Sequence, residues 1–573
     1  MINPIPPGLI FILGALLLPL FKGRFKQAYL FLLALLGFID LCLLKMGTHW
    51  VIRFLNYDLI LLKVDRLSLA MGIIFIVIGL FAILYSLHVK EDGQHVAALI
   101  YMGSSLGVVF SGDYFSLFFF WEIMAVASTF LIWYRKEKLS LDAGFRYLFM
   151  HILGGCALLT GIILHVVSTR SIAVQPLASS LASSFILIGF GLNAAFLFIH
   201  TWLPDAYPEG TVTGSVFLSV FTTKTGVYAL ARCFSGNEFI AYMGGAMAIF
   251  GVVYALLQND VRRLISYHII SQVGYMVAGI GVGTVLSVNG GIAHLINNLL
   301  YKTLLFMCMG SVIQMTGKRK LTELGGLAGK MPLTCATCVI ASLSISGAPG
   351  FNGFVSKGML ISSMAEAHQP LLEWMLRLAS VGTFLSFTKL CAFTFFSKND
   401  RIEAKEAPFN MTLAMIIIAS LSILVGIYPK ILFSILPHAP ADYHAYTLSH
   451  IIGVFQLFLS AGLVFVLAKG VFAPHSWIIL DFDYFYRMVF QWMGGFIKGP
   501  LNDLRLRIQA RSLRAVNDLT HLSRNPFAFL ERTHGRKEIP YDEDLYRKPM
   551  GLGVLLAILL LFLYGLIYLI KLP

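Results

Sequence analysis

Apolar runs of about 20 residues recur from one end of the sequence to the other, for example over residues 67–87 and 552–570. A helix of that length crosses a hydrocarbon core roughly 30 Å thick. Only 13% of the residues are charged, whereas an average soluble domain has about 25%. The sequence therefore predicts an all-α polytopic membrane protein and excludes a soluble enzyme or soluble binding domain.

The same length criterion predicts about sixteen transmembrane helices. The first is expected to be a retained span, because neither a basic leader nor a cleavage site accompanies it. The spans are expected to begin near residues 5, 27, 66, 96, 114, 146, 183, 212, 240, 263, 290, 333, 371, 411, 450 and 550.

The connectors between these spans differ in charge. If every span crosses once, lysine and arginine collect on one side, and the formal net charge of +14 comes largely from those connectors. The positive-inside rule then places both termini on the outer face of a bacterial or archaeal-type inner membrane, and nucleic acid is not an expected partner. The basic connectors lie at residues 22–26, 135–138, 262–263, 318–320 and 398–405, and the nearly uncharged ones at 168–182, 233–239 and 284–289.

Helices seven and twelve are predicted to be broken. Helix seven runs into a polar string with Pro204, and helix twelve contains Pro349 and Gly350 with apolar residues on both sides. Proline removes a backbone donor and glycine loosens a helix. Broken helices at corresponding positions of two halves are typical of an inverted-repeat transporter. We therefore expect two inverted five-helix repeats, helices four to eight and nine to thirteen.

This pattern divides the chain into six segments. Residues 473–549 place apolar side chains at helical spacing among arginines, which predicts a cytoplasmic-side amphipathic helix that either lies on lipid headgroups or straps a neighbouring subunit. The segments are 1–95 (helices one to three), 96–235 (first repeat), 236–397 (second repeat), 398–472 (helices fourteen and fifteen), 473–549 (the amphipathic region) and 550–573 (a final span).

Five ionisable residues stand inside predicted spans: Glu122, Lys224, His294, Lys302 and Lys357. A charged group in a span costs several kcal/mol unless it is paired or hydrated, so each is a functional hypothesis. His294 and Lys302 share one helical face. Each residue alone also fits a structural ion pair or a side chain that reaches the interface. Because four separate spans contribute, the set favours a proton relay.

Other polar residues in the spans carry a weaker signal. His151 fits a hydrogen-bonded packing histidine better than a relay member, and Lys389 fits either role. Cys335 and Cys338 have a metal-like spacing, but no second pair or nearby histidine completes a site, so both are expected to pack in the core. The sequence predicts no cofactor and no metal.

Several strings resemble the antiporter-like subunits shared by Mrp-type sodium/proton antiporters, respiratory complex I and membrane-bound hydrogenases. The resemblance covers roughly residues 65–430 and implies a fourteen-helix-type core with a central hydrophilic axis. The region after it looks like the lateral-helix extension of the distal complex I subunit. The strings are Trp121–Glu122, His200–Ala206, Thr223–Tyr228, Asp260–Arg263 with Ser271–Tyr275, and Gly353–Lys357.

The resemblance also implies roles by position. Glu122 matches the entry carboxylate, Lys224 the lysine of helix eight, His294 and Lys302 the helix-eleven group, and Lys357 the terminal lysine.

Two positions depart from the family pattern. Asn193 stands where the family has a helix-seven lysine, and Asn298 where a histidine is common. Asparagine carries no proton charge. Either the entry route is modified, with His151 or His200 and the neighbouring Asp205 as accessory groups, or the protein conducts poorly and is mainly a scaffold.

The leading functional prediction is a proton-translocating subunit of a multi-subunit complex, with Mrp-type sodium/proton antiport favoured. Its partners are then other membrane subunits, the lipid bilayer, protons and sodium. One alternative is a proton-pumping module of a complex I-like or hydrogenase-like redox complex; the chain itself has no cofactor motif and is not expected to be an enzyme alone. The other alternative is a non-conducting membrane scaffold.

Overall fold

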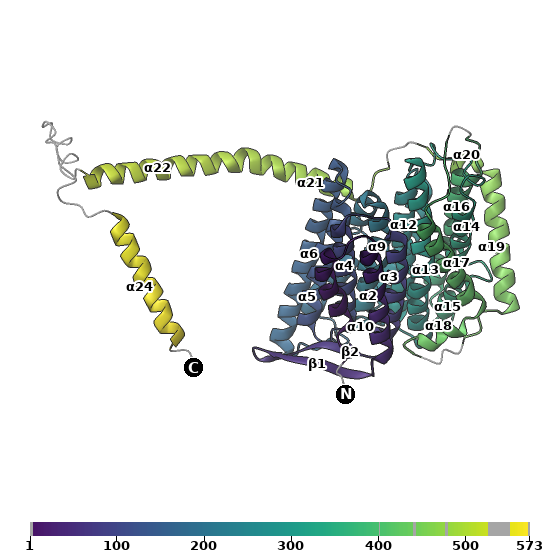
Figure 1. Ribbon diagram of the computed structural model, residues 1–573, viewed down its shortest axis with the longest axis horizontal. Helices are drawn as coiled ribbons and strands as arrows, with labels where there is room; N and C mark the ends of the chain where they lie inside the picture. Colours follow the sequence, from purple (N-terminus) through teal and green to yellow (C-terminus); the bar gives the residue numbers. More distant parts are fainter. Residues whose placement is uncertain (1–3, 400–401, 439–442, 476–478, 525–549, 571–573) are drawn as a thin grey trace. The chain divides into compact units, whose positions relative to one another are not determined.

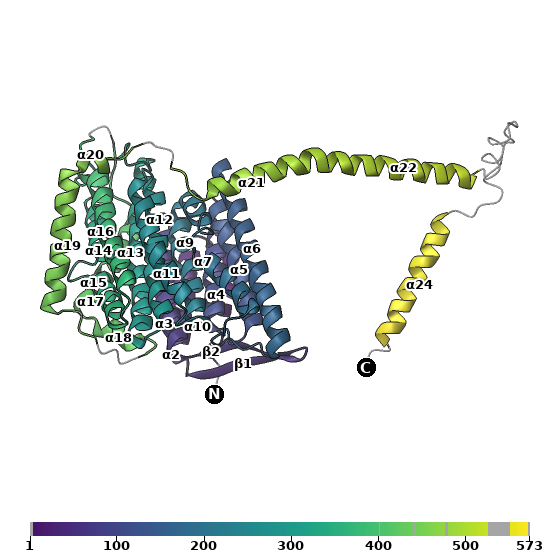
Figure 2. The ribbon, with the colours of Figure 1, turned by 180° about the vertical axis from the view of Figure 1, so that it is seen from behind.

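The chain forms two compact units, Met1–Asp481 and Phe482–Pro573. The computed structural model describes residues 4–399, 402–438, 443–475, 479–524 and 550–570. In unit one, long helices stand side by side, as Figure 1 and the reverse view in Figure 2 both show. In both views the helices of the first half lie on one side of this unit and those from α14 to α19 on the other.

Helices account for almost all of unit one. Two short 3-10 helices, η1 (Leu18–Leu20) and η2 (Tyr207–Glu209), and one π-helical segment, η3 (Ala392–Phe396), directly follow α-helices. The helices are α1 (Pro7–Leu17), α2 (Gly23–Leu43), α3 (Arg66–Ser86), α4 (Asp92–Phe110), α5 (Tyr114–Trp133), α6 (Lys138–Thr169), α7 (Leu181–Asn193), α8 (Trp202–Ala206), α9 (Val212–Val220), α10 (Thr222–Cys233), α11 (Glu238–Leu257), α12 (Val261–Val282), α13 (Val285–Thr316), α14 (Pro332–Ser346), α15 (Asn352–Glu366), α16 (Pro370–Cys391), α17 (Phe409–Ile427), α18 (Lys430–Ile435), α19 (Leu448–Leu467) and α20 (Lys469–Phe472).

The protein is a multi-pass membrane protein. Within the described ranges, 11 helices are long and apolar enough to cross a membrane. Shorter apolar helices include α1 with η1, α7, α14 and part of α24. A helix lies at each of the expected span positions, but the count of sixteen crossings stays a prediction.

A β-hairpin, which the sequence analysis did not anticipate, lies at the foot of unit one in Figure 1. Strands β1 (Gly47–Phe54) and β2 (Tyr57–Val64) pair antiparallel. The backbone of Ile60 bonds on both sides: its carbonyl accepts from Gly112 N at 2.9 Å, and its N–H donates to the Asp113 carboxylate at 2.6 Å. The hairpin is thereby fixed to the start of α5. We call this side of unit one the hairpin end.

Basic connectors gather at the opposite side, which we call the arginine end. Arg135 and Arg319 both pair with Glu209, at 2.9 and 3.0 Å, and Arg319 also pairs with Asp260. Asp260 caps α12 by accepting from the N–H of Arg262 at 2.9 Å. The predicted clustering of these connectors is therefore observed, whereas the side of the membrane that they face stays a prediction.

Helix seven is interrupted between α7 and α8. The chain turns through left-handed backbone at Ala195 (φ 58°) and Phe198 (φ 74°). The expectation that Pro204 marks the break was wrong, because Pro204 lies inside α8 and the turn precedes it. Trp202 Nε1 donates to the Leu192 carbonyl at 3.1 Å and satisfies an acceptor at the end of α7.

Helix twelve is interrupted between α14 and α15, and this segment contains Pro349 and Gly350. Gly347 and Gly350 both have positive φ, 87° and 89°, which glycine adopts without steric cost. Asn352, the first residue of α15, exchanges hydrogen bonds with Asn297 of α13. Asn297 donates to the Asn352 carbonyl at 2.7 Å, and Asn352 donates back at 3.3 Å. The helix α13 thus holds the break in place.

Helix eight is also interrupted, which the sequence analysis did not predict. Phe221 separates α9 from α10 with φ −95° and ψ −64°. Neither proline nor glycine lies at this position. The interruption therefore has another physical cause, which lies in the side chains around it.

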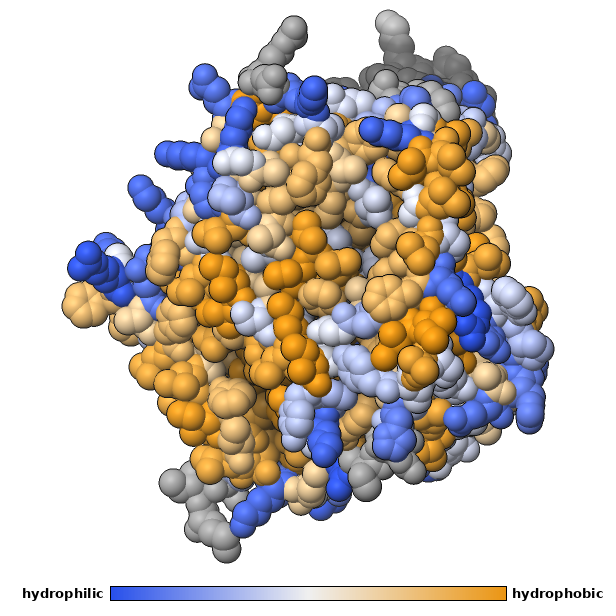
Figure 3. Space-filling model, turned by 90° about the vertical axis from the view of Figure 1, so that its right-hand side faces the viewer, coloured by the Kyte–Doolittle hydropathy of each residue, from blue (hydrophilic) through white to orange (hydrophobic). Residues whose placement is uncertain are grey.

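The surface of unit one suits a lipid environment. Figure 3 shows apolar side chains across the middle of one face and charged side chains toward its edges. On α19, Leu448, Leu459 and Leu467 are all strongly exposed. A contiguous apolar surface of this kind is expected of a protein whose solvent is hydrocarbon.

Unit two consists of helices with the exposed apolar side chains expected of the amphipathic region. Phe485 and Trp492 of α21 are more than half exposed. Residues 525–549 of the predicted amphipathic region lie outside the described residues. The elements are α21 (Asp483–Phe496), the turn η4 (Ile497–Leu501), α22 (Asn502–Arg524) and α24 (Met550–Ile570).

Candidate functional site

Three of the buried lysines lie close together inside the helix bundle. Lys224 on α10 and Lys302 on α13 have no exposed surface, and Lys357 on α15 is 4% exposed. Lys302 is close enough to both of the others for their charges to interact. None of the three faces lipid. Burial of a lysine costs free energy, and ionisable residues buried in this way are typically functional groups. We call these residues the lysine row.

Lys224 lies at the interruption of helix eight. Its ammonium donates to the Ser219 carbonyl at 2.8 Å. On the other side of the break, the Thr222 N–H donates to the hydroxyl of Tyr101 at 3.0 Å. Side chains therefore replace the missing helical hydrogen bonds, and irregular backbone is tolerated at membrane depth only where this happens.

A chain of hydroxyl groups extends from this break. Thr222 Oγ1 lies 2.6 Å from the Tyr101 hydroxyl and 3.4 Å from that of Tyr147, which lies 2.9 Å from Ser128 Oγ. A hydroxyl both donates and accepts. These contacts join α4, α5, α6 and α10 into one hydrogen-bonded network next to Lys224.

Glu122, the expected entry carboxylate, lies on α5 at intermediate exposure. Its Oε1 is buried and has no hydrogen-bond partner among the described residues. It packs against Gly155 of α6, where an added Cβ would come within 2.1 Å of that oxygen. The described contacts do not connect Glu122 to the lysine row.

Asn193, which stands in place of the family lysine, is fully buried at the end of α7. Neither its amide nitrogen nor its oxygen has a hydrogen-bond partner in the described part of the chain. The end of α7 packs closely on α10: a Cβ at Gly226 would lie 2.7 Å from Ala194 N. Asn193 is thus near the helix that carries Lys224, but it brings no charge there.

The accessory residues near helix seven have defined partners. His151 Nδ1 lies 2.9 Å from the Tyr147 carbonyl, and its ring packs 4.6 Å from Trp202. These contacts favour the packing role. Asp205 forms a two-pronged ion pair with Arg146 at 2.7 and 3.0 Å, which accounts for its charge without a place in the lysine row.

His294 joins α12, α13 and α15. Its two ring nitrogens lie 3.1 Å from Ser356 Oγ and 3.1 Å from Gln272 Oε1. Tyr301 donates to the same Gln272 oxygen at 3.2 Å. Because Ser356 precedes Lys357 in α15, the hydrogen bond of His294 lies directly beside Lys357 in the chain.

Lys302 and Lys357 differ in how their ammonium groups are held. Lys302 donates to the Ile265 carbonyl at 3.2 Å. Lys357 Nζ has no hydrogen-bond partner among the residues that the structure describes, and lies 5.1 Å from the centre of the Tyr275 ring. That ring lies 5.3 Å from His294. Tyr275 is therefore a neighbour of both His294 and Lys357.

Sequence reasoning missed the place of Gln272, Tyr275 and Ser356 in the site, since it named them only within the matching strings. It also missed His268, which is fully buried in α12 and close enough to Lys302 and Lys357 for charge interaction. His268 packs 4.6 Å from Phe387, and Lys302 Nζ lies 5.8 Å from the same ring. The available signal was a histidine one turn before Gln272 in the same predicted span.

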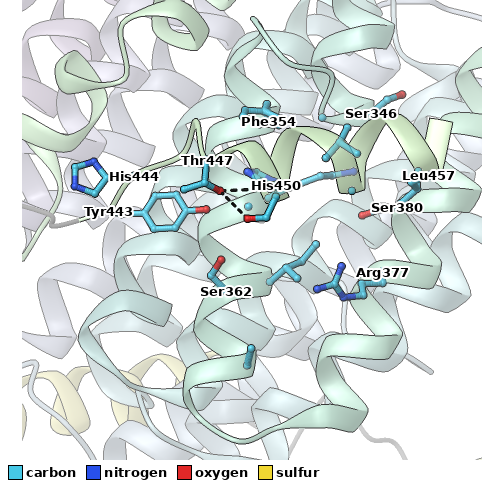
Figure 4. Close-up of a pocket in the computed structure, with 18 of the residues that line it drawn as sticks. Ser346, Phe354, Ser362, Arg377, Ser380, Tyr443, His444, Thr447, His450 and Leu457 are labelled. Carbon is cyan, nitrogen blue, oxygen red and sulfur yellow. Dashed lines mark hydrogen bonds between the residues drawn. The ribbon is translucent and has the colours of Figure 1, made fainter. Parts of the chain in front are cut away.

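A cavity of about 410 Å³ leads to Lys357. It lies between α15, α16 and α19 and the loop before α19 (Figure 4). The lining includes buried Lys357 at one extreme and exposed Glu366 at the other, so the cavity connects the lysine to the surface. Arg377, Ser380 and His450 also line it.

The remaining candidate residues make contacts that fit a structural role. Lys389 donates to the carbonyls of Leu256 and Gln258, at 2.7 and 3.1 Å, and so caps the end of α11. Asn298 is fully buried on α13, one turn from His294 and one from Lys302. Cys338 is fully buried in α14.

A family model described as NADH:quinone oxidoreductase/Mrp antiporter, TM, matches residues 111–386. The matched residues, just under half of the chain, resemble this antiporter family. The matched range contains Glu122 and the whole lysine row. It ends before α17 and excludes all of unit two.

Two curated relatives are named as components of sodium/proton antiporters. The A subunit of the Na(+)/H(+) antiporter of Alkalihalophilus pseudofirmus is 29% identical over 426 residues, which cover 64% of this chain and 52% of the relative. The A1 subunit of the Na(+)/H(+) antiporter of Staphylococcus epidermidis is 30% identical over 437 residues, which cover 68% and 54%. This chain therefore spans a little over half the length of these relatives.

Two solved structures share the fold. A chain of the membrane-bound sulfane sulfur reductase, an archaeal respiratory membrane complex, matches with a TM-score of 0.70 and 24% identity over 98% of this chain and 100% of that one. A chain of the Mrp complex from Dietzia sp. matches with a TM-score of 0.65 and 19% identity over 79% and 95%. Both belong to complexes, and at these identities they establish the fold alone.

Proposed function

We propose that this chain is a proton-translocating subunit of a multi-subunit, Mrp-type sodium/proton antiporter. The lysine row carries the proposal: three buried lysines lie within interaction range, and one of them meets a cavity. The named functions of the two antiporter relatives support it. Other membrane subunits of the same complex are its partners.

The proton pathway follows the row. Lys224 is the central proton-loading site, His294 and Lys302 are connectors, and Lys357 is the terminal exchange group. Glu122 is the entry-side carboxylate, reached through water. A proton that moves onto or off one site changes the electrostatic energy of the next, because charges interact strongly in a low dielectric.

The cavity is the exit at the hairpin end. Lys357 has no protein acceptor in the described residues, so water in the cavity is available to receive its proton. The positive-inside rule puts the arginine end in the cytoplasm and therefore the cavity on the outer side of a bacterial or archaeal-type plasma membrane.

The architecture proposed for this function has sixteen crossings and two inverted five-helix repeats, residues 96–235 and 236–397. The interruptions of helices seven and twelve support it, since one lies in each half.

The proposal is tested with Lys357→Ala in the intact complex. Antiport is measured as cation-dependent proton movement in everted vesicles, and the amount of assembled complex is measured in the same membranes. We expect transport to be abolished with assembly intact, because the exchange group is lost. Lys320→Ala removes an exposed lysine that pairs loosely with Glu323 at 3.7 Å, and should transport normally. Normal antiport by Lys357→Ala would refute the proposal.

A second candidate is the proton-pumping module of a redox complex. The extent of the structural match favours it. The sulfane sulfur reductase chain matches 98% of this chain, whereas the Mrp chain matches 79%. Purification of the complex with a tagged chain decides between them. Small antiporter subunits in the preparation support the first function, and hydrogenase-like or quinone-reductase-like subunits support the second.

A further inference from the structure

A buried acid–base pair lies at the break of helix seven, outside the lysine row. Asp481 Oδ1 is 3.3 Å from Nε2 of His200. The His200 side chain has no exposed surface, and that of Asp481 is 6% exposed. Asp481 lies far beyond residue 386, where the family match ends. A segment outside the matched region therefore supplies a carboxylate to the antiporter core.

The carboxylate is held by side chains of α11 and α12. Tyr267 donates its hydroxyl proton to Asp481 Oδ2 at 2.6 Å, and Tyr254 donates to the preceding carbonyl, that of Leu480, at 3.1 Å. Phe250 stacks on Tyr254 at 4.3 Å and packs 4.8 Å from the His200 ring. One oxygen of Asp481 is thus fixed by a phenol, and the other faces the imidazole.

The position of the pair suits proton entry. Tyr267 lies about two turns into α12 from Asp260, so the pair is near the arginine end, opposite the cavity at Lys357. The other end of the same break has no charge to offer, because Asn193 cannot ionise. The Oε1 atom of Glu122 likewise has no hydrogen-bond partner within the described ranges.

We propose that Asp481 and His200 form a proton-exchanging pair through which protons enter the core at the break of helix seven. Asp481 binds a proton from water at the arginine end and passes it to His200 Nε2, which leaves a carboxylate beside an imidazolium. His200 then releases the proton toward the lysine row and returns to the neutral form. This inference rests on the proposed transport function and names the entry residues of its pathway.

The test replaces the acid in the intact complex. Asp481→Asn keeps the shape and the acceptor for Tyr267 but removes the ionisable group. We expect antiport per assembled complex to fall at least about tenfold, since positioned acid–base groups contribute that much or more to proton transfer. Asp483→Asn is the matched control two residues away, where the carboxylate pairs with Arg487 near the surface, and it should transport normally.

A second variant separates proton exchange from anchoring of the segment. Asp481→Glu restores a carboxylate, and we expect it to recover part of the rate with a shifted pH profile, because the groups facing the carboxylate (His200, Tyr267 and Tyr254) are unchanged. A rate per complex in Asp481→Asn equal to wild type, even with less complex in the membrane, would overturn the proposal. So would a Glu variant that is as inactive as Asn. Normal transport by Lys357→Ala would instead refute the transport function itself, so the two failures are distinct.

Discussion

Four buried lysines of this chain differ in how many protein oxygens hold the ammonium group. Lys389 donates to two carbonyls, Lys224 and Lys302 each donate to one, and Lys357 donates to none among the described residues. An ammonium that donates to two carbonyls is fixed at the end of α11. One that meets only a ring face and a cavity is free to exchange its proton with water. Lys357 has the fewest protein acceptors of the four, which matches the exchange role that we propose for it.

At the residue scale, the ion pairs of Glu209 make stability depend on pH. Glu209 lies in the connector between α8 and α9. Burial alone would raise its pKa, but the hydrogen bond and charge of Arg319, with the charge of Arg135, outweigh burial and leave the pKa below its usual value. Because the folded pKa is the lower one, the stabilisation is complete above the unfolded value of about 4.3 and is lost as the pH falls through the folded value.

We expect Glu209→Gln to lower the free energy of unfolding at neutral pH by about 1–3 kcal/mol, since hydrogen bonds to charged groups contribute that much. The loss should shrink as the pH falls below about 4. Thermal unfolding of the detergent-solubilised protein measures both. Glu323→Gln removes an exposed carboxylate as the control and should change stability by less than about 0.5 kcal/mol. Equal responses of the two variants to pH would contradict the assignment.

The lysine row could be predicted from sequence because lysines are rare inside apolar runs. His268 and Asp481 could not. A histidine close to polar neighbours fits ordinary packing, and Asp481 meets His200 only after the chain has crossed the intervening helices. Pairing across such a separation depends on tertiary structure, which one sequence does not display.

At the element scale, breaks that depend on backbone chemistry were easier to predict than breaks that depend on side-chain contacts. Glycines with positive φ mark helix twelve, and the sequence places that break correctly. For helix seven the proline misled, since Pro204 is tolerated near the start of the short α8. The break at Phe221 left no signal, because hydroxyl and ammonium groups of other residues maintain it.

The contact between α15 and α19 yields a prediction about the cavity. A Cβ at Gly358 would lie 2.2 Å from Cε1 of His450, whose ring stacks on Phe354 at 4.2 Å. We expect Gly358→Ala to displace His450 at a cost of about 1–3 kcal/mol and to lower antiport, because His450 lines the cavity to Lys357.

Vesicle transport assays measure the effect of this substitution. Gly462→Ala, a glycine of α19 with no atom within 4 Å of its added Cβ, is the matched control and should transport normally. If both glycine variants transport equally well, the ring of His450 has no influence on the exit.

At the scale of the whole molecule, unit one contains every residue of the proposed pathway. The lysine row, the cavity and Asp481 all lie within Met1–Asp481. The sequence alone could predict a membrane protein with helices at the observed positions, because hydropathy and length determine them. It did not reveal the β-hairpin, whose strands carry no separate hydrophobic core.

Asn193 is the position that tests whether the molecule conducts or only supports its neighbours. We expect complexes with the wild-type chain and with Asn193→Lys to show equal, robust proton flux after reconstitution, since the Asp481–His200 pair supplies the entry in both. Flux that requires the lysine would favour the scaffold function.

The interruptions of helices eight and twelve differ in what would be needed to form a continuous helix there. Gly347 and Gly350 sit at positive φ, so a continuous helix there would require two residues to cross the barrier to right-handed backbone. Phe221 already occupies the right-handed region, and hydrogen bonds made by Lys224 and Tyr101 replace those of a continuous helix. A change in the hydrogen bond of Lys224 would therefore act directly on the interruption of helix eight, whereas the interruption of helix twelve is built into the backbone of two glycines.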